Sequence, residues 1–242
     1  MARARKRYNG RRPYPFAALI GAFLACLVAG GTASAAQPEA GLDPNATTDT
    51  GGDAKPSEGP AYAVDGFRSA HFGMTEEAVR SAIRADFKIP DGKIVKETNA
   101  TERTTALTIS VPNLLPGAGP AKVSYIFGYA HKQLIHVNAI WTGPKPAEGQ
   151  PNEFLGAATA LRNYFLSLGF EREGLVHDAQ LTNGALLLFQ GSDQKGRMVS
   201  LVVGTIQVPR GEKPPGTEQV IRLSYIENPK HPDIYRIPPG SF

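Results

Sequence analysis

The sequence predicts an α+β protein made of two fused αβββ-type repeats, with one antiparallel sheet and the helices packed on one of its faces. The first observation behind this prediction is an internal repeat. The run VSYIFG from Val123 recurs as VSLVVG from Val199, 76 positions later. A matching run follows each copy, QLIHVNAI from Gln133 and QVIRLSYI from Gln219, and six of the 14 compared positions are identical. A duplicated unit restricts the architecture more than local propensity does.

The second observation is the spacing between helix and strand in the two copies. A candidate helix start at Thr75 lies 48 residues before Val123, and one at Asn152 lies 47 residues before Val199. This agreement is independent of the runs that define the repeat. The alternative explanation is that alternating strands resemble one another through composition alone.

The third observation is the alternation of residue type in the last strand of each copy. Apolar Val137 and Ala139 alternate with polar neighbours, as the second copy also does. Successive side chains of a strand point to opposite faces of a sheet. We therefore expect the helices to cover the apolar face and leave an open, wet face, whose polar side chains are His136, Asn138, Arg222 and Ser224.

The first repeat is expected over residues 61–143. A short strand at 65–72 precedes Thr75, which suits a helix N-cap, and Glu76 and Glu77 place negative charge on the first helical turn. Apolar residues then recur at helical spacing to Phe87. Three strands are predicted after the helix: Thr104–Val111, Lys122–Tyr129 and Lys132–Thr142.

The second repeat is expected over residues 144–242. Its helix follows Asn152 and carries one apolar stripe ending at Leu168. Residues 209–218, an insertion relative to the first copy, are predicted to be an exposed loop, and residues 228–242 an extended tail that docks along the domain or a partner. The predicted strands are Ala185–Gln190, Arg197–Gln207 and Gln219–Glu227.

The N-terminal residues 1–36 have the pattern of a secretory signal peptide. Six of the 26 basic residues lie in the first twelve positions, residues 16–36 contain no charge, and the run ends at an A-x-A site. We expect cleavage after Ala35 or Ala36, which gives a periplasmic or secreted protein without a stable membrane span; the alternative is an uncleaved N-terminal anchor. Residues 37–60 contain a single large apolar residue, Leu42, and are expected to form a disordered tether.

The remaining chain argues against several classes of function. Beyond the first twelve residues it carries 20 basic and 22 acidic residues, so no excess of positive charge indicates nucleic acid as a partner. The only cysteine, Cys26, lies in the predicted signal peptide. No phosphate loop, dinucleotide fingerprint or nucleophile elbow is present, and the five histidines lack metal-ligand spacing. We therefore predict no cofactor, no metal site and no catalytic residues.

The run from Ala70 to Val79 reads AHFGMTEEAV. It resembles the FGMT-x-x-x-V opening of the β-lactamase inhibitor proteins and of the small lipoprotein of the outer-membrane β-barrel assembly machine. The resemblance implies a strand that ends at the Gly-Met-Thr turn, a helix after it and an antiparallel sheet packed on the helix. The inhibitor proteins are tandem copies of such a unit. Both families act by binding other proteins, so the resemblance implies binding rather than catalysis.

These observations predict a non-catalytic protein-interaction module of the cell envelope, which is an inhibitor, an assembly factor or an accessory subunit. The candidate partner-binding residues are His136, Asn138 and Arg222 on the wet face, Leu114 and Leu115 in a Pro/Gly-rich loop, and Trp141 at the end of a strand. The alternative for the leucines is that they fold back under the sheet edge, and for Trp141 that it lies at the edge of the core. Two other functions stay open: a small-molecule or lipid carrier with its ligand between sheet and helices, and a hydrolase of envelope polymers with fold-assembled carboxylates.

Overall fold

The computed structural model describes residues 62–242 except 148, 211–212, 239 and 242. The predicted signal peptide, its cleavage site at Ala35 or Ala36 and the predicted tether lie outside these residues. Two α-helices, α2 and α3, two short 3-10 helices and ten strands are described. In chain order they are β1 (Gly66–Phe67), β2 (Ala70–His71), α2 (Glu76–Phe87), η2 (Asp91–Lys93), β3 (Val95–Thr98), β4 (Thr105–Val111), β5 (Ala121–Phe127), β6 (Leu134–Pro144), α3 (Glu153–Leu166), η3 (Arg172–Gly174), β7 (Val176–Gln180), β8 (Leu186–Ser192), β9 (Met198–Arg210) and β10 (Lys213–Ile226).

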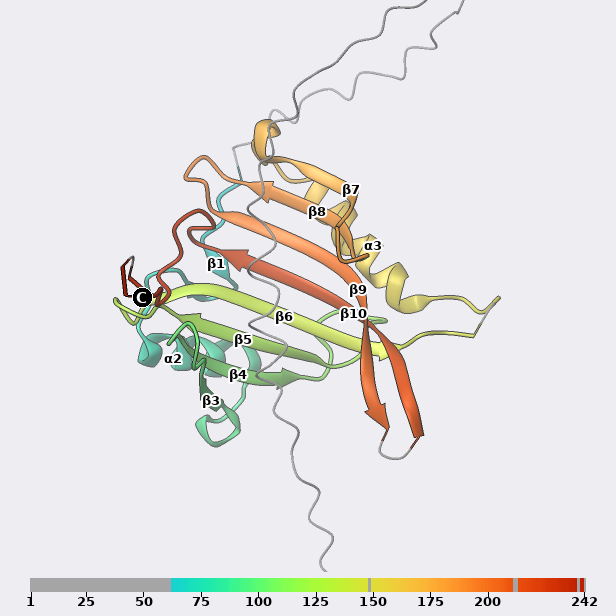
Figure 1. Ribbon diagram of the computed structural model, residues 1–242, viewed down its shortest axis with the longest axis horizontal. Helices are drawn as coiled ribbons and strands as arrows, with labels where there is room; N and C mark the ends of the chain where they lie inside the picture. Colours follow the sequence, from blue (N-terminus) through green and yellow to red (C-terminus); the bar gives the residue numbers. More distant parts are fainter. Residues whose placement is uncertain (1–61, 148, 211–212, 239, 242) are drawn as a thin grey trace, which may run out of the picture. The chain divides into compact units, whose positions relative to one another are not determined.

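Eight of the strands form one antiparallel sheet in the order β3-β4-β5-β6-β10-β9-β8-β7 (Figure 1). Strands β3–β6 come from the first predicted repeat and β7–β10 from the second, and the two repeats meet where β6 pairs with β10. The predicted α+β class and antiparallel sheet are confirmed. The strand order of one half is the mirror of the other along the sheet, as an internal repeat related by a local two-fold axis requires.

Each repeat contributes one strand more to this sheet than the sequence predicted, and the short strand predicted at 65–72 is instead a small hairpin of two strands, β1 and β2. Strands β3 and β7 are short, polar in sequence and largely exposed, and they form the two edges of the sheet. Such runs lack the alternating apolar residues that mark a strand in the sequence. Hydrogen bonding to the edge of β4 or β8 decides their conformation instead.

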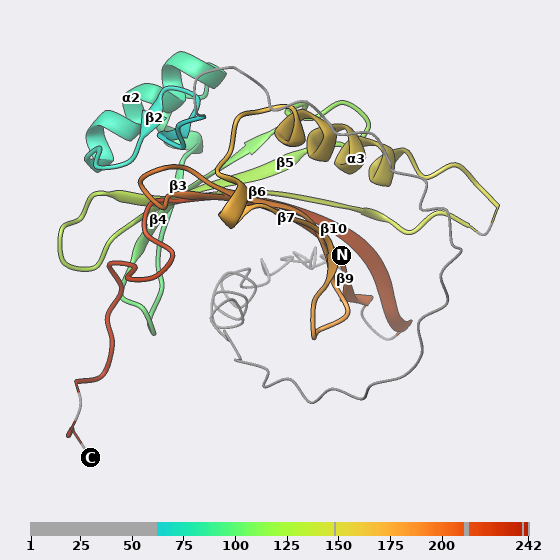
Figure 2. The same ribbon diagram turned by 90° about the horizontal axis from the view of Figure 1, so that it is seen from above.

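Both α-helices lie on the same face of the sheet, as Figure 2 shows in profile. The hydrophobic core fills the layer between the helices and the sheet. Its strand residues come from alternate positions of β4, β5, β6, β9 and β10. Val137 and Ala139 face this core together with their partners on β10, Tyr225 and Leu223. The apolar half of the predicted alternation is therefore confirmed.

The helix starts follow the predicted N-caps. The side chain of Thr75 accepts a hydrogen bond from the Ala78 N–H at the start of α2, and the side chain of Asn152 accepts one from the Leu155 N–H at the start of α3. Each cap satisfies a backbone donor that has no partner inside its own helix. None of the helices in the described part of the chain combines the length and the hydropathy that a membrane crossing needs.

The predicted loop at residues 209–218 is wrong for most of its length. Strands β9 and β10 continue to pair beyond Pro144, the last residue of β6, and the ladder is interrupted by a register shift between Lys213 and Gly216. The insertion therefore lengthens a hairpin, which projects past the other strands in Figure 1. The Pro214-Pro215 pair favoured the loop prediction, because proline has no N–H to donate to a strand ladder. Proline is nevertheless tolerated at a bulge.

The C-terminal segment docks on the body of the protein over residues 228–236, which is one of the two predicted alternatives. The Tyr235 N–H donates to the Glu102 carbonyl at 2.9 Å, and the Tyr235 ring lies edge-on to Tyr129. The Arg103 guanidinium lies 3.7 Å from the centroid of the Tyr235 ring, a cation–π arrangement. The segment is held by these contacts rather than by regular secondary structure.

Candidate functional site

A row of polar residues crosses the middle of the sheet on the face opposite the helices. Cross-strand register places one residue from each of six neighbouring strands directly beside the next. All six carry a hydroxyl or a carboxamide and none is charged. We call this set the polar row: Thr108, Ser124, Asn138, Ser224, Ser200 and Gln190.

The polar row is symmetric about the junction of β6 and β10. Ser124 and Ser200 occupy the same position in the two VS runs, and the register pairs them with Asn138 and Ser224, which also correspond in the repeat. Thr108 and Gln190 then occupy corresponding positions at the ends of the row. The structure thus reproduces the repeat alignment at Ser124 and Ser200 and at Asn138 and Ser224.

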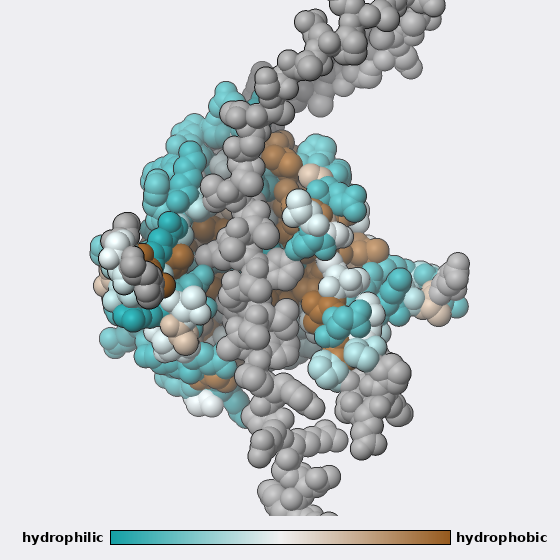
Figure 3. All heavy atoms as spheres, viewed as in Figure 1, coloured by the Kyte–Doolittle hydropathy of each residue, from teal (hydrophilic) through white to brown (hydrophobic). Residues whose placement is uncertain are grey.

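Mostly longer side chains border the polar row on both sides, two residues away along each strand. One flanking set is Ile126, His136, Ile226 and Met198, and the other is Lys122, Ile140, Arg222 and Val202. Successive residues on one face of a strand are about 6.6–6.8 Å apart. The short polar side chains therefore lie low between larger ones. Figure 3, which views the molecule from this side, shows apolar side chains in brown over the described part of the face, with hydrophilic side chains around them.

The hydrogen bonds within the polar row differ between the two repeats. In the first repeat the Thr108 and Ser124 hydroxyls are 2.9 Å apart and share a hydrogen bond. At the centre the Ser224 hydroxyl donates to Asn138 Oδ1 at 2.6 Å. In the second repeat Ser200 Oγ and Gln190 Oε1 are both buried and have no hydrogen-bond partner. A buried polar group without a partner costs about 1–3 kcal/mol, so this asymmetry needs a physical reason.

His136 completes the centre of the face. Its Nε2 lies 2.9 Å from Asn138 Oδ1. Burial, reinforced by the nearby positive charge of Arg222, lowers the pKa of the His136 imidazole to about 4, although the hydrogen bond to Asn138 acts in the opposite direction. The ring is therefore neutral at physiological pH. Since Asn138 Oδ1 can only accept, the proton of the neutral ring is on Nε2.

Three of the predicted partner-binding residues are brought together here, on the face on which the sequence placed them. His136, Asn138 and Arg222 all belong to the polar row or its flanking sets. The expectation that the face is wet is wrong at its centre, because His136 is only 8% exposed and Asn138 only 6%. Arg222 is half-buried, and desolvation lowers its pKa.

The other three predicted residues lie elsewhere. Trp141 faces the helices, is 1% exposed and belongs to the core, so its interpretation as a partner anchor is wrong. Leu114 and Leu115 are half-buried and pack against the same core. Their loop turns back at Gly117, which has a left-handed φ of +81° and approaches the start of α3. The apolar pair gains more from the core than from solvent exposure, which is the alternative that the sequence left open.

Sequence reasoning missed Thr108, Ser124, Ser200 and Gln190. The signal was available in part, because Ser124 and Ser200 are among the six identical positions of the repeat. Their meaning depends on which residues lie opposite them, and cross-strand register is not written in either run. Gln190 was predicted as the last residue of a strand and carried no sign of a function.

The polar row offers hydrogen-bonding groups to a binding partner, but its own hydrogen bonds do not indicate an activated nucleophile. Ser224 donates its proton to an amide oxygen rather than to a base, and His136 bonds to the same oxygen. A serine nucleophile needs a general base within hydrogen-bond reach of its hydroxyl. Among the residues that the structure describes, no group of three or more His, Cys, Asp or Glu side chains could hold a metal ion.

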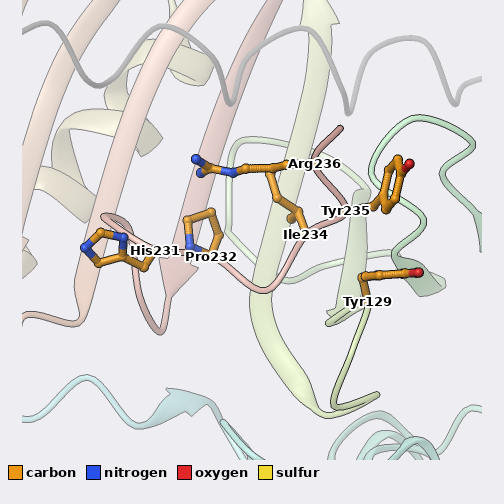
Figure 4. Close-up of a pocket in the computed structure, with 6 residues that line it drawn as sticks. All are labelled: Tyr129, His231, Pro232, Ile234, Tyr235 and Arg236. Atoms are coloured by element: carbon orange, nitrogen blue, oxygen red, sulfur yellow. The ribbon is translucent and has the colours of Figure 1, made fainter. Parts of the chain in front are cut away.

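A pocket separate from the polar row lies beside the C-terminal segment. It is an open pocket of about 520 Å³ lined by six residues: Tyr129, His231, Pro232, Ile234, Tyr235 and Arg236. Figure 4 shows the two tyrosines at one end and His231 at the other. The adjacent Asp233 carboxylate accepts hydrogen bonds from the Ala130 and His131 N–H groups, each at 2.9 Å, and so ties the segment to the β5–β6 turn. The polar groups beside this pocket therefore attach the C-terminal segment to the body of the protein.

Comparison of the chain with protein-family models, with curated proteins and with solved structures finds no match.

Proposed function

We propose that this protein is an exported, non-catalytic interaction module that binds another protein of the cell envelope through the sheet face opposite its helices. The observation that supports this proposal most strongly is this uncovered face of the sheet. Both repeats contribute four strands to it, and none of the described helices lies over it. Protein interfaces combine apolar and hydrogen-bonding side chains, and this face carries both.

The residue types on this face favour a protein partner. The polar row supplies neutral hydrogen-bonding groups at its centre, and the flanking sets supply half-buried, branched apolar side chains such as Ile140 and Ile226. The only charged side chains in these sets are the cationic Lys122 and Arg222. A mixture of apolar anchors and well-placed polar groups gives a protein interface both affinity and specificity.

The predicted signal peptide supports the envelope location, and the resemblance of the run AHFGMTEEAV to two families of binding proteins supports the type of activity. The β-lactamase inhibitor proteins are tandem repeats, and a tandem repeat that forms one sheet agrees with that resemblance. The carrier and hydrolase functions stay predictions, and no contact among the described residues favours either of them.

Site-specific photo-crosslinking in the native cell envelope tests the proposal. One probe replaces Ile140 on the proposed face, and the control replaces Thr159, which is exposed on α3 on the other side of the sheet. We expect a discrete adduct with one protein from position 140 and none from position 159. With that partner purified, Ile140→Asp should weaken binding at least about tenfold, whereas Thr159→Asp should change it less than about twofold. Equal adducts from both positions, or none from position 140, would overturn the proposal.

A further inference from the structure

The two ends of the polar row are chemically different although the repeat makes them equivalent. In the first repeat Thr108 lies opposite Ser124, and the two hydroxyls bond to each other. In the second repeat Gln190 takes the place of threonine opposite Ser200. A threonine hydroxyl sits on Cβ, close enough to reach the serine across the strands, whereas the carboxamide of glutamine lies two carbon atoms further out. The longer side chain therefore passes the serine and leaves both groups without a partner.

The unpartnered groups define a donor and an acceptor that lie side by side. Gln190 Oε1 can only accept a hydrogen bond, and Ser200 Oγ can donate one. Their Cβ atoms, as directly opposite residues of an antiparallel pair, are about 4.5–5.5 Å apart and point to the same side of the sheet. A complementary ligand group must therefore present an N–H donor and an oxygen acceptor next to each other at one end.

A primary carboxamide has this shape, because its NH₂ and C=O groups diverge from the same carbon atom. A trans peptide group differs, since its N–H and C=O point in opposite directions and only one of them can reach the pair at a time. A carboxylate offers no donor to Gln190 Oε1. We propose that Ser200 and Gln190 bind the side-chain carboxamide of an asparagine or glutamine that the partner protein inserts into the β8–β9 end of the face. This inference rests on the proposed function and identifies the group that the partner presents.

The neighbouring side chains allow such an insertion. On β9 the residues that border Ser200 on its own face are Met198 and Val202. Methionine is unbranched and repacks at small cost, and the Gln190 side chain has three rotatable bonds of its own. Ser200 is 3% exposed, so a ligand reaches its hydroxyl only when these flexible side chains move aside. The polar cost that the free protein carries at this pair is then removed on binding.

Nuclear magnetic resonance titration of the full-length, isotope-labelled protein with three small amides tests this inference. Acetamide presents the adjacent donor and acceptor, N-methylacetamide presents them on opposite edges, and N,N-dimethylacetamide has no donor. We expect saturable shifts of the Gln190 side-chain amide and the Ser200 backbone amide with acetamide. N-methylacetamide should bind about 3–10-fold more weakly, and N,N-dimethylacetamide more weakly again.

Variants at the pair and away from the face give the contrast. Ser200→Ala should abolish the acetamide response, whereas Thr159→Ala, an exposed change on α3 on the other side of the sheet, should leave it within about twofold. Gln190→Thr copies the first repeat, should close the pair internally, raise the melting temperature and also abolish the response. This variant keeps the test decisive if Ser200→Ala folds poorly. An absent response, or the same response from Thr159→Ala and Ser200→Ala, would overturn the inference and leave an internal water as the partner of the pair.

The crosslinking result separates this inference from the proposed function. Adducts from position 140 together with no acetamide response would overturn the carboxamide site alone. A specific acetamide response with no adduct from position 140 would support a carboxamide site on a face that does not bind an envelope protein, and would overturn the proposed function.

Discussion

Replacing Asp193 by asparagine should destabilise the protein far more than a change to an exposed ion pair. Asp193 lies in the β8–β9 turn, is 5% exposed and accepts four hydrogen bonds. Its Oδ2 accepts from the Val64 N–H at 3.0 Å and from Arg197 Nε at 2.8 Å, and its Oδ1 accepts from the Lys195 and Arg197 N–H groups, each at 2.9 Å. One carboxylate thus closes the turn and attaches the first described residues of the chain to it.

The magnitude follows from the loss of the charge. Burial alone would raise the pKa of Asp193, but the N–H groups of Val64 and Arg197 and the Arg197 guanidinium lower it below the ordinary value, so the carboxylate is ionised at neutral pH. Asparagine turns an NH₂ group towards at least one of these donors and removes the counter-charge of a mostly buried guanidinium. Breaking a buried pair in this way costs about 3–5 kcal/mol. Arg197 keeps its second contact, to Asp65 at 2.5 Å, so the lower end, about 3 kcal/mol, is expected.

Urea denaturation followed by circular dichroism at pH 7 measures this difference. The midpoint should fall at an unchanged m-value, because the surface exposed on unfolding is the same. Asp178→Asn is the matched control. The Asp178 carboxylate lies on the exposed edge strand β7 and pairs with Arg162 of α3. Removing its charge should leave the midpoint within experimental error. A loss of less than about 1 kcal/mol for Asp193→Asn would refute the argument that the buried carboxylate organises the turn.

Three further changes have defined outcomes. Gly143→Ala places a Cβ atom 2.9 Å from the Phe154 ring and should destabilise the protein by about 1–3 kcal/mol in urea denaturation, whereas Gly204→Ala meets its nearest atom at 3.4 Å and should cost less than about 1 kcal/mol. His136 should make stability depend on pH, because its pKa is lowered to about 4 in the folded protein: the unfolded chain binds a proton between about pH 6.5 and 4 and the folded chain does not, so stability is lost as the pH falls. The loss from pH 7.5 to pH 5 should be about 2 kcal/mol and should largely disappear in His136→Gln; an unchanged pH slope in that variant would contradict the assignment. Asp233→Ala should speed amide hydrogen exchange in residues 228–236 while the exchange of β5 and β6 stays as it is; equal exchange of the C-terminal segment in both proteins would show that the tyrosine contacts suffice to hold it.

Much of the architecture could be predicted because it depends on patterns that are local in the sequence. Thr75 and Asn152 cap their helices as predicted, since a cap needs only a side-chain oxygen and the backbone that follows it. The alternation around Val137 identifies the core face, since side-chain direction in a strand has a period of two. The edge strands β3 and β7 were missed because their conformation comes from a neighbouring strand and not from their own residues.

The candidate site was only half predictable for a similar reason. Sequence alternation placed His136, Asn138 and Arg222 on one face, and the structure brings them together there. The interpretation of Trp141 as a partner anchor overlooked the same alternation, which places this residue, four positions after Val137, on the core face. The position of the Leu114–Leu115 loop could not be predicted from the sequence, because its burial depends on the distance between the loop and α3.

The sequence by itself determined the repeat, the two capped helices, the alternation of the strands and the basic, then apolar N-terminal segment, because each is a short-range pattern. Only the tertiary structure decided which residues face one another. It joined β6 to β10, aligned six polar side chains across the sheet and set Gln190 opposite Ser200 where the first repeat sets Thr108 opposite Ser124. Hydrogen bonds form between atoms that are close in space, and the register between strands, which no single strand encodes, determines which atoms those are.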